Sequence, residues 1–558
     1  IHRGGCISHA AARDSRGPFG LRIYTLLLLW SLMLGVWNFR AIGAERPNIL
    51  LILADDLGYS DIGCFGGEIK TPNLDALARG GLRFTQFYNA TRCCPTRASL
   101  LTGLYPHQAG VGDMTGDRGA QFPGYRGFLQ PRAVTLAQVL KSAGYRTYMV
   151  GKWHLTDKSG PIRRGFDEFY GMIGGFNSFW QENPFYTRLP QGRAKRDYAP
   201  DKFYSTDVFG DYALDFLADA RAHSDQPWFL YLAFNAPHFP LHAPKEETDK
   251  YAALYEKGWD AIRAERLARM KKLGLVAKDT KLTPRSDYHH PFWNQRGVNP
   301  AWDSLPAERR KDLARRMAVY AGMVDRLDQT VGRVVNDLRA SGQLDNTLLV
   351  FLSDNGACAE WDPVGFDVAT GPKTTNILHT AEMLAGMGLP GTYHSYGSGW
   401  ANACNTPWRL YKHYGHEGGI STPFIVHWPK GTKRKGEIDQ RPGHIVDIMA
   451  TLVEVSGANY PKELAGHDIL PMEGRSFLPA LRGDAPQPRT LFWEHHGNRA
   501  VRDGRWKLVA KEGETKWELF DIDADRTELN DLAAKHPDKV TDLRTQWEAW
   551  SKRVGVQP

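Results

Sequence analysis

Residues 48–56 read Asn-Ile-Leu-Leu-Ile-Leu-Ala-Asp-Asp, an apolar run that ends abruptly in two carboxylates. A continuous apolar run of this length is typical of a strand buried on both faces of a parallel sheet. The pattern returns at 347–355, where another apolar run ends in Asp354 and Asn355. Both stretches therefore predict parallel strands whose carboxyl ends carry acidic and amide side chains.

Two further apolar runs end in reactive side chains. Residues 145–150 lead into Lys152 and His154, and residues 228–234 lead into His238. Amphipathic helical stretches lie between the runs, at 135–142 and 314–339. This alternation predicts a wound α/β fold with a large mixed, mostly parallel sheet sandwiched by helices. In such sheets, ligands bind at the carboxyl ends of the strands.

The chain changes character after the apolar run at 424–428. Residues 430–490 are rich in Gly, Pro and charge, and then come short strand-like runs at 490–494, 505–509 and 517–520 and a helical stretch at 538–553. We expect a catalytic domain over 45–430 and a smaller C-terminal α+β domain with a short antiparallel sheet over 431–558. The segments 175–225, 240–310 and 358–405 show weaker periodicity and are interpreted as long excursions around the pocket rim.

The first 44 residues have the order of a signal peptide. Arg13, Arg16 and Arg22 precede the apolar run 23–37, and small residues follow at 41–44. A membrane anchor is the alternative, but the run is shorter than the roughly 20 apolar residues that span a bilayer. The pattern predicts an exported protein, periplasmic or secreted, without stable membrane insertion after removal of the leader.

Charge and cysteine content narrow the class of partner. Half of the net charge of +8 lies in residues 1–44, and no Lys/Arg-rich block with interleaved aromatic residues follows, so we expect no nucleic-acid partner. A mildly basic pocket would suit a small anionic substrate. Removing Cys6 with the leader leaves an odd number of cysteines, and the adjacent Cys93 and Cys94 are an unusual place for a structural disulfide.

The adjacent cysteines open the segment Cys-Cys-Pro-Thr-Arg-Ala-Ser-Leu-Leu-Thr-Gly, residues 93–103. It can be read as a turn from strand to helix, with Pro95 in the first helical turn and a buried cysteine beside it. It can also be read as a nucleophile at a helix N-terminus, where free backbone N–H groups hold an oxyanion such as sulfate. Arg97, one turn further along, would share the face of Cys93 and supply a permanent positive charge.

Four oxygen ligands follow the first two predicted strands: Asp55, Asp56, Asp354 and Asn355. Carboxylate and amide oxygens favour calcium or magnesium. An Asp-Asp pair alone is most often a solvated loop, and Asp-Asn-Gly alone is most often a turn. Because they occur together with the cysteine motif, we expect a metal site.

The Cys-x-Pro-x-Arg core with its Leu-Thr-Gly tail, preceded by Asp-Asp and followed by Ser-Asp-Asn-Gly, resembles the type I formylglycine-dependent sulfatases of the alkaline-phosphatase superfamily. The resemblance covers roughly residues 46–555 and is strongest to the bacterial arylsulfatases. The segments 265–269, 405–412 and 517–521 also look like that group. One departure is Ser421-Thr422-Pro423, where the group often has Arg before x-Pro.

The resemblance implies an alkaline-phosphatase-like fold, a sulfate-ester substrate of the aryl or carbohydrate class, and a maturation enzyme that oxidises Cys93 to formylglycine (3-oxoalanine). It also implies one Ca²⁺, with Mg²⁺ as the weaker alternative, bound by the four oxygen ligands and the modified residue 93. The catalytic residues that it implies are Cys93, Arg97, Lys152, His154, His238 and Lys412. His107, His413 and His416 lie near motifs but outside the family's catalytic positions.

The resemblance implies a mechanism as well. The aldehyde would hydrate to a geminal diol, and one hydroxyl, activated by Asp354, would attack sulfur in line. His238 and Lys412 would protonate the leaving alcohol, and His154 would accept a proton as sulfate is expelled. Two alternatives stay open: a phosphate or phosphonate ester hydrolase of the same superfamily, and a sulfated-glycan binding protein with an unmodified site.

Overall fold

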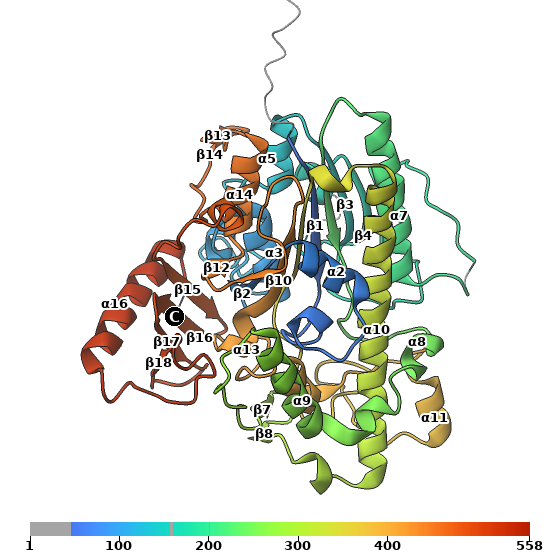
Figure 1. Ribbon diagram of the computed structural model, residues 1–558, viewed down its shortest axis with the longest axis vertical. Coiled ribbons are helices and arrows are strands. Elements are labelled where there is room, and N and C mark those ends of the chain that lie inside the picture. The colour runs from blue at the N-terminus through green and yellow to red at the C-terminus, as the bar shows by residue number, and fades with distance from the viewer. Residues whose placement is uncertain (1–45, 157–159, 200, 558) are drawn as a thin grey trace, which may run out of the picture. The chain divides into compact units, whose positions relative to one another are not determined.

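The computed structural model describes residues 46–156, 160–199 and 201–557 (Figure 1). Residues Pro47–Pro558 form one compact unit. The expected signal peptide, 1–44, lies outside the described residues and stays a prediction. None of the described helices is both long and apolar enough to cross a membrane.

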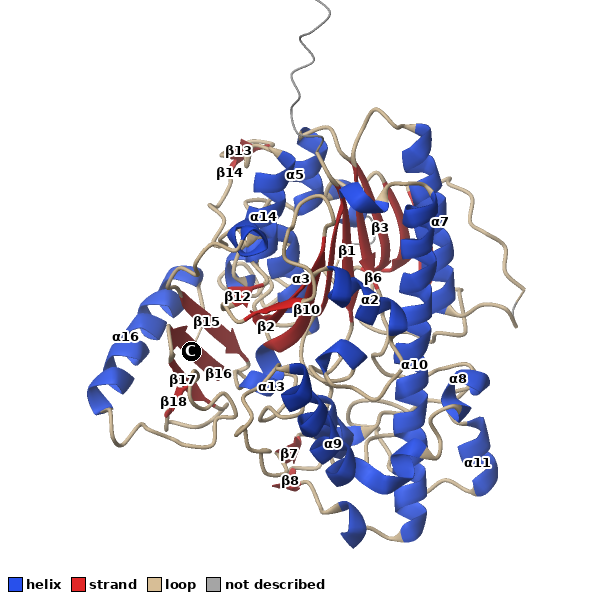
Figure 2. Ribbon diagram, in the orientation of Figure 1, coloured by secondary structure: helices blue, strands red, loops and turns tan. Residues whose placement is uncertain are grey.

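A mixed sheet runs through the middle of this unit (Figure 2). Within the described residues it has ten strands, in the order β11-β2-β10-β9-β1-β6-β3-β4-β5, with β12 paired to β2. Its centre is parallel and consists of β9 (Thr347–Ser353), β1 (Asn48–Ala54), β6 (Trp228–Ala233), β3 (Arg146–Lys152) and β4 (Glu168–Met172). Toward the edges lie β10 (Ser421–His427), β2 (Leu82–Tyr88), β5 (Tyr186–Leu189), β11 (Glu437–Asp439) and β12 (Gly443–His444). The antiparallel pairs are β10 with β9, β10 with β2, and β4 with β5, so the mixed, mostly parallel sheet is confirmed.

The register brings the ends of the central strands to one level. Ala54 lies opposite Ser353, and Ala233 lies opposite both Leu53 and Gly151. The side chains that follow these strands must therefore meet along one edge of the sheet. Gly151 is needed there because its φ is 110° and a Cβ atom would collide with the carbonyl oxygen of Ala233.

Helices cover both faces of the sheet, and alternate strand residues point to each. One face buries Leu50, Ile52 and Phe351 beneath α2 (Pro72–Gly80), α7 (Ser205–Ala222) and α10 (Ala307–Ala340). The other face buries Ile49, Leu51 and Val350 beneath α3 (Cys93–Thr102), α5 (Leu136–Ser142) and α14 (Asp447–Ser456). Burial on both faces is why the central strands read as unbroken apolar runs.

The remaining helices and strands are mostly shorter. Helices are α4 (Pro106–Ala109), α6 (Gly160–Arg163), α8 (Lys245–Asp249), α9 (Gly258–Leu273), α11 (Ala381–Gly386), α12 (Gly397–Cys404), α13 (Glu417–Ile420) and α15 (Leu478–Arg482). Strands β7 (Asp287–His290) and β8 (Gln295–Val298) form one hairpin, and β13 (Glu463–Leu464) and β14 (His467–Asp468) form another.

A second sheet lies near the C-terminus, as predicted. It is an antiparallel meander of β15 (Thr490–His495), β16 (Asn498–Asp503), β17 (Trp506–Ala510) and β18 (Glu518–Asp521). One face packs on α16 (Pro537–Val554), and the other meets Tyr88 of the main sheet and Ile420 of α13 (Figure 1). The proposed boundary at residue 430 stays a prediction, and β11 and β12, which follow it, pair with the main sheet.

Many elements were not predicted. Strands β2, β4, β5 and β16 of the two sheets are among them, and helices α7 and α9 lie in segments interpreted as long excursions around the pocket rim. Helix α7 buries Phe209, Phe216 and Leu217 on one side. Helix α9 buries Arg263 and Arg266, and this charge on its inner face conceals its apolar stripe.

Candidate active site

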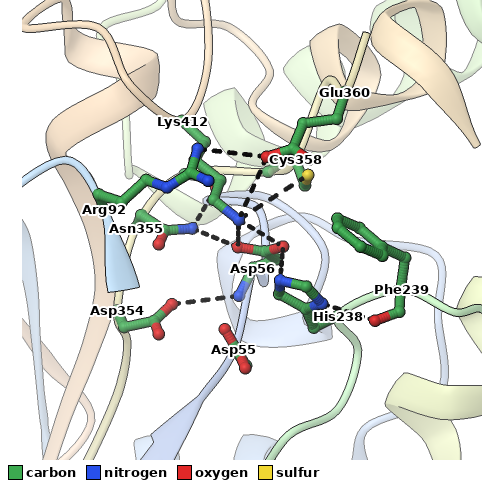
Figure 3. A network of polar contacts seen from close by, with 12 residues as sticks. Asp55, Asp56, Arg92, His238, Phe239, Asp354, Asn355, Cys358, Glu360 and Lys412 are labelled. Atoms are coloured by element: carbon green, nitrogen blue, oxygen red, sulfur yellow. Dashed lines mark hydrogen bonds and ion pairs between the residues drawn. The ribbon is translucent and has the colours of Figure 1, made fainter. Parts of the chain in front are cut away.

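The four predicted metal ligands meet at the carboxyl ends of β1 and β9 (Figure 3). The Nδ2 atom of Asn355 lies 2.6 Å from Oδ1 of Asp56, and the backbone N–H of Asp56 donates to Oδ1 of Asp354 over 3.2 Å. All four, including Asp55, are at most 1% exposed. The parallel register of the two strands therefore assembles one buried cluster from residues 298 positions apart in sequence.

Three basic side chains surround the three carboxylates. The Lys152 Nζ lies 2.6 Å from Oδ2 of Asp55, and the Arg97 Nη2 lies 2.9 Å from Oδ2 of Asp354. The Lys412 Nζ lies 2.8 Å from Oδ1 of Asp56. These residues come from β3, from α3 and from the segment before α13, so three separate elements deliver positive charge to one point. Such fixed charges suit an anionic substrate.

Two oxygen atoms of the cluster find no partner in the part of the chain that the structure describes. Among the described residues, Oδ1 of Asp55 and Oδ1 of Asn355 are buried without a hydrogen-bond partner. Orphaned buried acceptors are rare in proteins and call for a bound ion or water. Hard oxygen ligands of this kind are those that calcium prefers, so the residues fit a bound cation. Asp55, Asp56 and His238 form another possible ligand set, because their ligand atoms all lie within 4.8 Å of one another.

The pKa shifts of the carboxylates also favour a bound cation. Burial raises the pKa of Asp55 well above its ordinary value, and the carboxylate of Asp354 raises it further. Burial also raises the pKa of Asp354. Burial would raise that of Asp56 too, but the Lys412 ammonium outweighs it, and the pKa of Asp56 falls below its usual range. Added positive charge would keep Asp55 and Asp354 ionised.

Cys93 is the first residue of α3, as the helix-start interpretation predicted. Arg92 holds the N-cap position without a side-chain capping hydrogen bond, which leaves the N–H groups of Cys93 and Cys94 to bind an anion. Pro95 has no N–H, and that of Thr96 donates to the carbonyl oxygen of Arg92 over 2.9 Å. Cys93 is buried, and a hydrogen bond from Cys94 lowers the pKa of its thiol well below the ordinary value despite that burial. The position therefore stabilises negative charge at side chain 93.

Two histidines flank this point. The Nε2 of His154 lies 3.2 Å from Sγ of Cys94, which was interpreted as only the variable position of the motif. The Nδ1 of His238 lies 2.6 Å from the carbonyl oxygen of Phe239, so Nδ1–H donates and Nε2 faces Asp56 at 3.5 Å. Burial lowers the pKa of His154 to about 4 and that of His238 to about 3, so both rings are neutral at neutral pH.

Three neighbours of Lys412 were not predicted. The Glu360 carboxylate lies 4.0 Å from the Lys412 Nζ and 3.2 Å from Nη1 of Arg92, and the Sγ of Cys358 lies 3.9 Å from the same Nζ (Figure 3). Arg92 directly precedes the cysteine motif, and Cys358 and Glu360 follow Asn355 closely, so proximity to the motifs was the available signal. Together with Lys412 and His413, Arg92 and Glu360 line a hollow of about 790 Å³.

The chain is similar in sequence to known sulfatases. A family model described as Sulfatase matches residues 47–458, and one described as N-sulphoglucosamine sulphohydrolase, C-terminal, matches residues 408–550. An arylsulfatase of Klebsiella aerogenes is 37% identical over 447 residues, which cover 77% of this chain and 91% of that protein. An uncharacterised sulfatase of Schizosaccharomyces pombe is 37% identical over 545 residues, 92% of this chain and 95% of the relative. The crystal structure of Ps i-CgsB with k-i-k-neocarrahexaose is 27% identical with a TM-score of 0.63, covering 91% of this chain and 93% of that one.

Proposed function

The chain belongs to the sulfatase family, and on that premise we propose that it hydrolyses sulfate monoesters with a formylglycine at position 93 and one calcium ion. Hydrolysis of sulfate esters is the activity of the family. The observation that carries the finer proposal is the position of Cys93 at the start of α3, beside three buried cations and an all-oxygen ligand cluster.

The sulfuryl group would lie at the N-terminus of α3. There the N–H groups of Cys93 and Cys94 and the side chains of Lys152, Arg97 and Lys412 would neutralise its oxygens. Because these cations are already fixed by carboxylates, they need little reorganisation as charge develops, and one such donor is typically worth about 3–4 kcal/mol of barrier. This arrangement favours in-line attack by side chain 93 on the sulfur atom.

Calcium would be held by Asp55, Asp56, Asp354 and Asn355, with the modified residue 93 beside them. The two orphaned oxygens of this cluster support the assignment. Bound there, the ion would lower the pKa of the attacking hydroxyl and polarise the sulfate. Asp354, whose Oδ2 is held by Arg97, would accept the proton of the attacking group.

The two neutral histidines would transfer protons at different steps of the reaction. The Nε2 of His154 lies at the cysteine end of the site, where it can accept the proton whose loss expels sulfate from residue 93. Lys412 and His238 lie on the leaving-group side. His238 lacks the needed proton in the resting site, but a bound sulfate anion would raise its pKa and favour the charged ring.

For the substrate class, we propose small aryl sulfates or sulfated carbohydrates. The relative named arylsulfatase and the structure containing a neocarrahexaose support the two classes respectively. The hollow of about 790 Å³ beside Lys412 has room for either. We further propose export to the periplasm or the medium and maturation by a formylglycine-generating enzyme.

Mass spectrometry of the peptide containing Cys93, from protein made in its own host, tests the nucleophile. We expect an aldehyde at residue 93 and a free thiol at Cys94, with 4-nitrophenyl sulfate turned over far faster than the corresponding phosphate. An unmodified Cys93 in protein that cleaves sulfate esters at full rate would refute formylglycine. Preference for phosphate would instead favour the phosphoesterase alternative.

A further inference from the structure

A second cluster of nitrogen and oxygen donors lies outside the catalytic residues. It consists of Asp113, His495 and His496, each of which offers one ligand atom, and these atoms all lie within 4.8 Å of one another. None of the three belongs to the proposed calcium ligands. Two imidazoles and one carboxylate form a donor set unlike the all-oxygen cluster, and such a set suits metals of the zinc class.

The hairpin between β15 and β16 places two of these donors. His495 pairs with Asn498, so His496 and Gly497 form a two-residue turn. Both turn residues have positive φ, 50° and 77°. Two-residue turns of this kind strongly favour Asn-Gly or Asp-Gly, and histidine is another residue that adopts positive φ more readily than most. The turn thus holds an imidazole where the backbone would prefer asparagine.

His495 supplies the observation that points to a ligand. Its side chain is fully buried, and its Nε2 atom has no hydrogen-bond partner among the described residues. Its other ring nitrogen, Nδ1, faces the carbonyl oxygen of Gly112 at 3.5 Å. Histidines that bind metals commonly direct the second ring nitrogen to a backbone carbonyl, which orients the first toward the ion.

Asp113 completes the donor set from a separate segment. Its Oδ1 contacts Nε2 of His496, and its Oδ2 pairs with Arg118. The segment is fixed because the N–H of Gly112 donates to the carbonyl of Gly124 over 2.8 Å. Asp113 and His496 are 383 positions apart, so the fold rather than the local sequence brings them together.

The pKa shifts of two donors favour the forms that bind a metal, an ionised Asp113 and a neutral His495. Burial would raise the pKa of Asp113, but the hydrogen bond from His496 outweighs it and the pKa falls. Burial lowers the pKa of His495 well below its ordinary value. The other groups facing the cluster are Arg118 and the His413 ring, 5.7 Å from that of His495, with Arg92 beyond it.

We propose that Asp113, His495 and His496 bind one divalent transition-metal ion of the zinc class, separate from the calcium site. Three protein ligands leave a fourth position open, as in zinc sites that also bind water or a substrate group. His496 lines the hollow that reaches Lys412. A group of a molecule bound in that hollow could therefore occupy the fourth position.

Zinc titration of the calcium-saturated full chain tests the proposal, with bound metal measured by calorimetry and elemental analysis. His496→Asn is the decisive variant, because Asn-Gly suits the turn and folding should be kept while a ligand is lost. We expect its zinc affinity to fall by more than the roughly 10-fold that loss of an outer hydrogen-bond partner costs. His467→Asn, in exposed β14, is the matched control and should bind zinc unchanged.

Cobalt substitution distinguishes this cluster from the thiols of Cys93 and Cys94, which with His154 form another potential metal group. Binding at the proposed site should give the visible bands of nitrogen and oxygen ligation without a thiolate charge-transfer band, and His496→Asn should abolish them. Equal zinc binding by the parent and His496→Asn would overturn the proposal. So would absence of zinc binding after calcium saturation, or a purely thiolate spectrum.

Discussion

Each carboxylate of the site is paired with a basic side chain, so single residues there have separable effects. Lys152 is paired with Asp55, Arg97 with Asp354, and Lys412 with Asp56. Asn355 is the neutral member, and its Oδ1 has no protein partner among the described residues. Its removal should therefore affect the metal without leaving a buried charge uncompensated.

Asn355→Ala should weaken calcium binding. The substitution deletes the orphaned carbonyl oxygen and the amide that donates to Asp56 over 2.6 Å. We expect at least the roughly 10-fold loss of affinity typical of damage to a metal's immediate surroundings, measured by calcium titration of the apoprotein. Asn336→Ala, exposed on α10, is the control. Unchanged affinity in Asn355→Ala would remove this residue from the ligand set.

Cys93→Ser should separate sulfuryl transfer from turnover. A serine hydroxyl at the start of α3 can accept the sulfuryl group, but it has no second hydroxyl whose proton His154 could remove to expel sulfate. We expect kcat to fall by roughly 10³-fold or more, as for loss of other covalent nucleophiles, with a sulfated peptide visible by mass spectrometry. Cys64→Ser, a buried thiol far from α3 in sequence, should keep activity. Sustained turnover by Cys93→Ser protein whose introduced hydroxyl is shown to be unmodified would contradict the mechanism.

Among the elements, strands β1, β3, β6 and β9 were predictable because their signals are local. Each is buried on both faces, which makes an unbroken apolar run, and polar side chains follow each of them closely. The central strand β4 was not predicted, because it begins with Glu168 and no polar side chain marks its end. Helix α9 was not predictable in this way. Its Arg266 is buried against Asp61 and Glu68, 2.6 Å from each, and those partners lie about two hundred positions away. Sequence pattern alone reads such an arginine as exposed.

Gly151→Ala should disturb the edge on which the site is built. Position 151 has a φ of 110°, and a methyl group there would collide with the carbonyl oxygen of Ala233 on β6. We expect a loss of about 1–3 kcal/mol in the free energy of unfolding, the usual cost of overpacking, together with reduced activity because Lys152 is adjacent. Gly174→Ala is the control, since an added Cβ there meets nothing within 4 Å. Equal urea midpoints for the two variants would show that β3 tolerates the change.

In the whole molecule, the features that the sequence does not reveal are those that depend on contacts between residues far apart in the chain. The six expected catalytic residues and four metal ligands were placed by motif, and the structure brings them to one sheet edge. The hollow, the second donor cluster and the contacts between the two sheets depend on tertiary partners. Glu417, for example, sits in a motif region but gives no sign that its partners are Lys507 and Arg526 of the C-terminal part.

Glu417 joins the small sheet to the main one. Its Oε1 lies 2.9 Å from Nζ of Lys507, its Oε2 lies 2.7 Å from Nε of Arg526, and Tyr88 donates to Oε2 over 3.2 Å. Burial would raise the pKa of Glu417, but Lys507 and Arg526 outweigh it and lower the pKa to about 2. The folded state therefore favours the ionised carboxylate more strongly than the unfolded chain does.

Glu417→Gln should destabilise the protein in a pH-dependent way. At pH 7 we expect a loss of about 3–5 kcal/mol, because Arg526 stays buried without its carboxylate partner and Lys507 keeps only Glu528, 2.8 Å away. A lowered folded-state pKa gives stability that is fully present above the unfolded value of 4.5 and is lost as the pH falls toward about 2. The difference between parent and variant should therefore shrink below pH 4.5 in urea unfolding. Glu548→Gln, exposed on α16, is the control and should stay within about 0.5 kcal/mol of the parent at every pH. A Glu417→Gln protein as stable as the parent at pH 7 would show that this charge cluster does not hold the two sheets together.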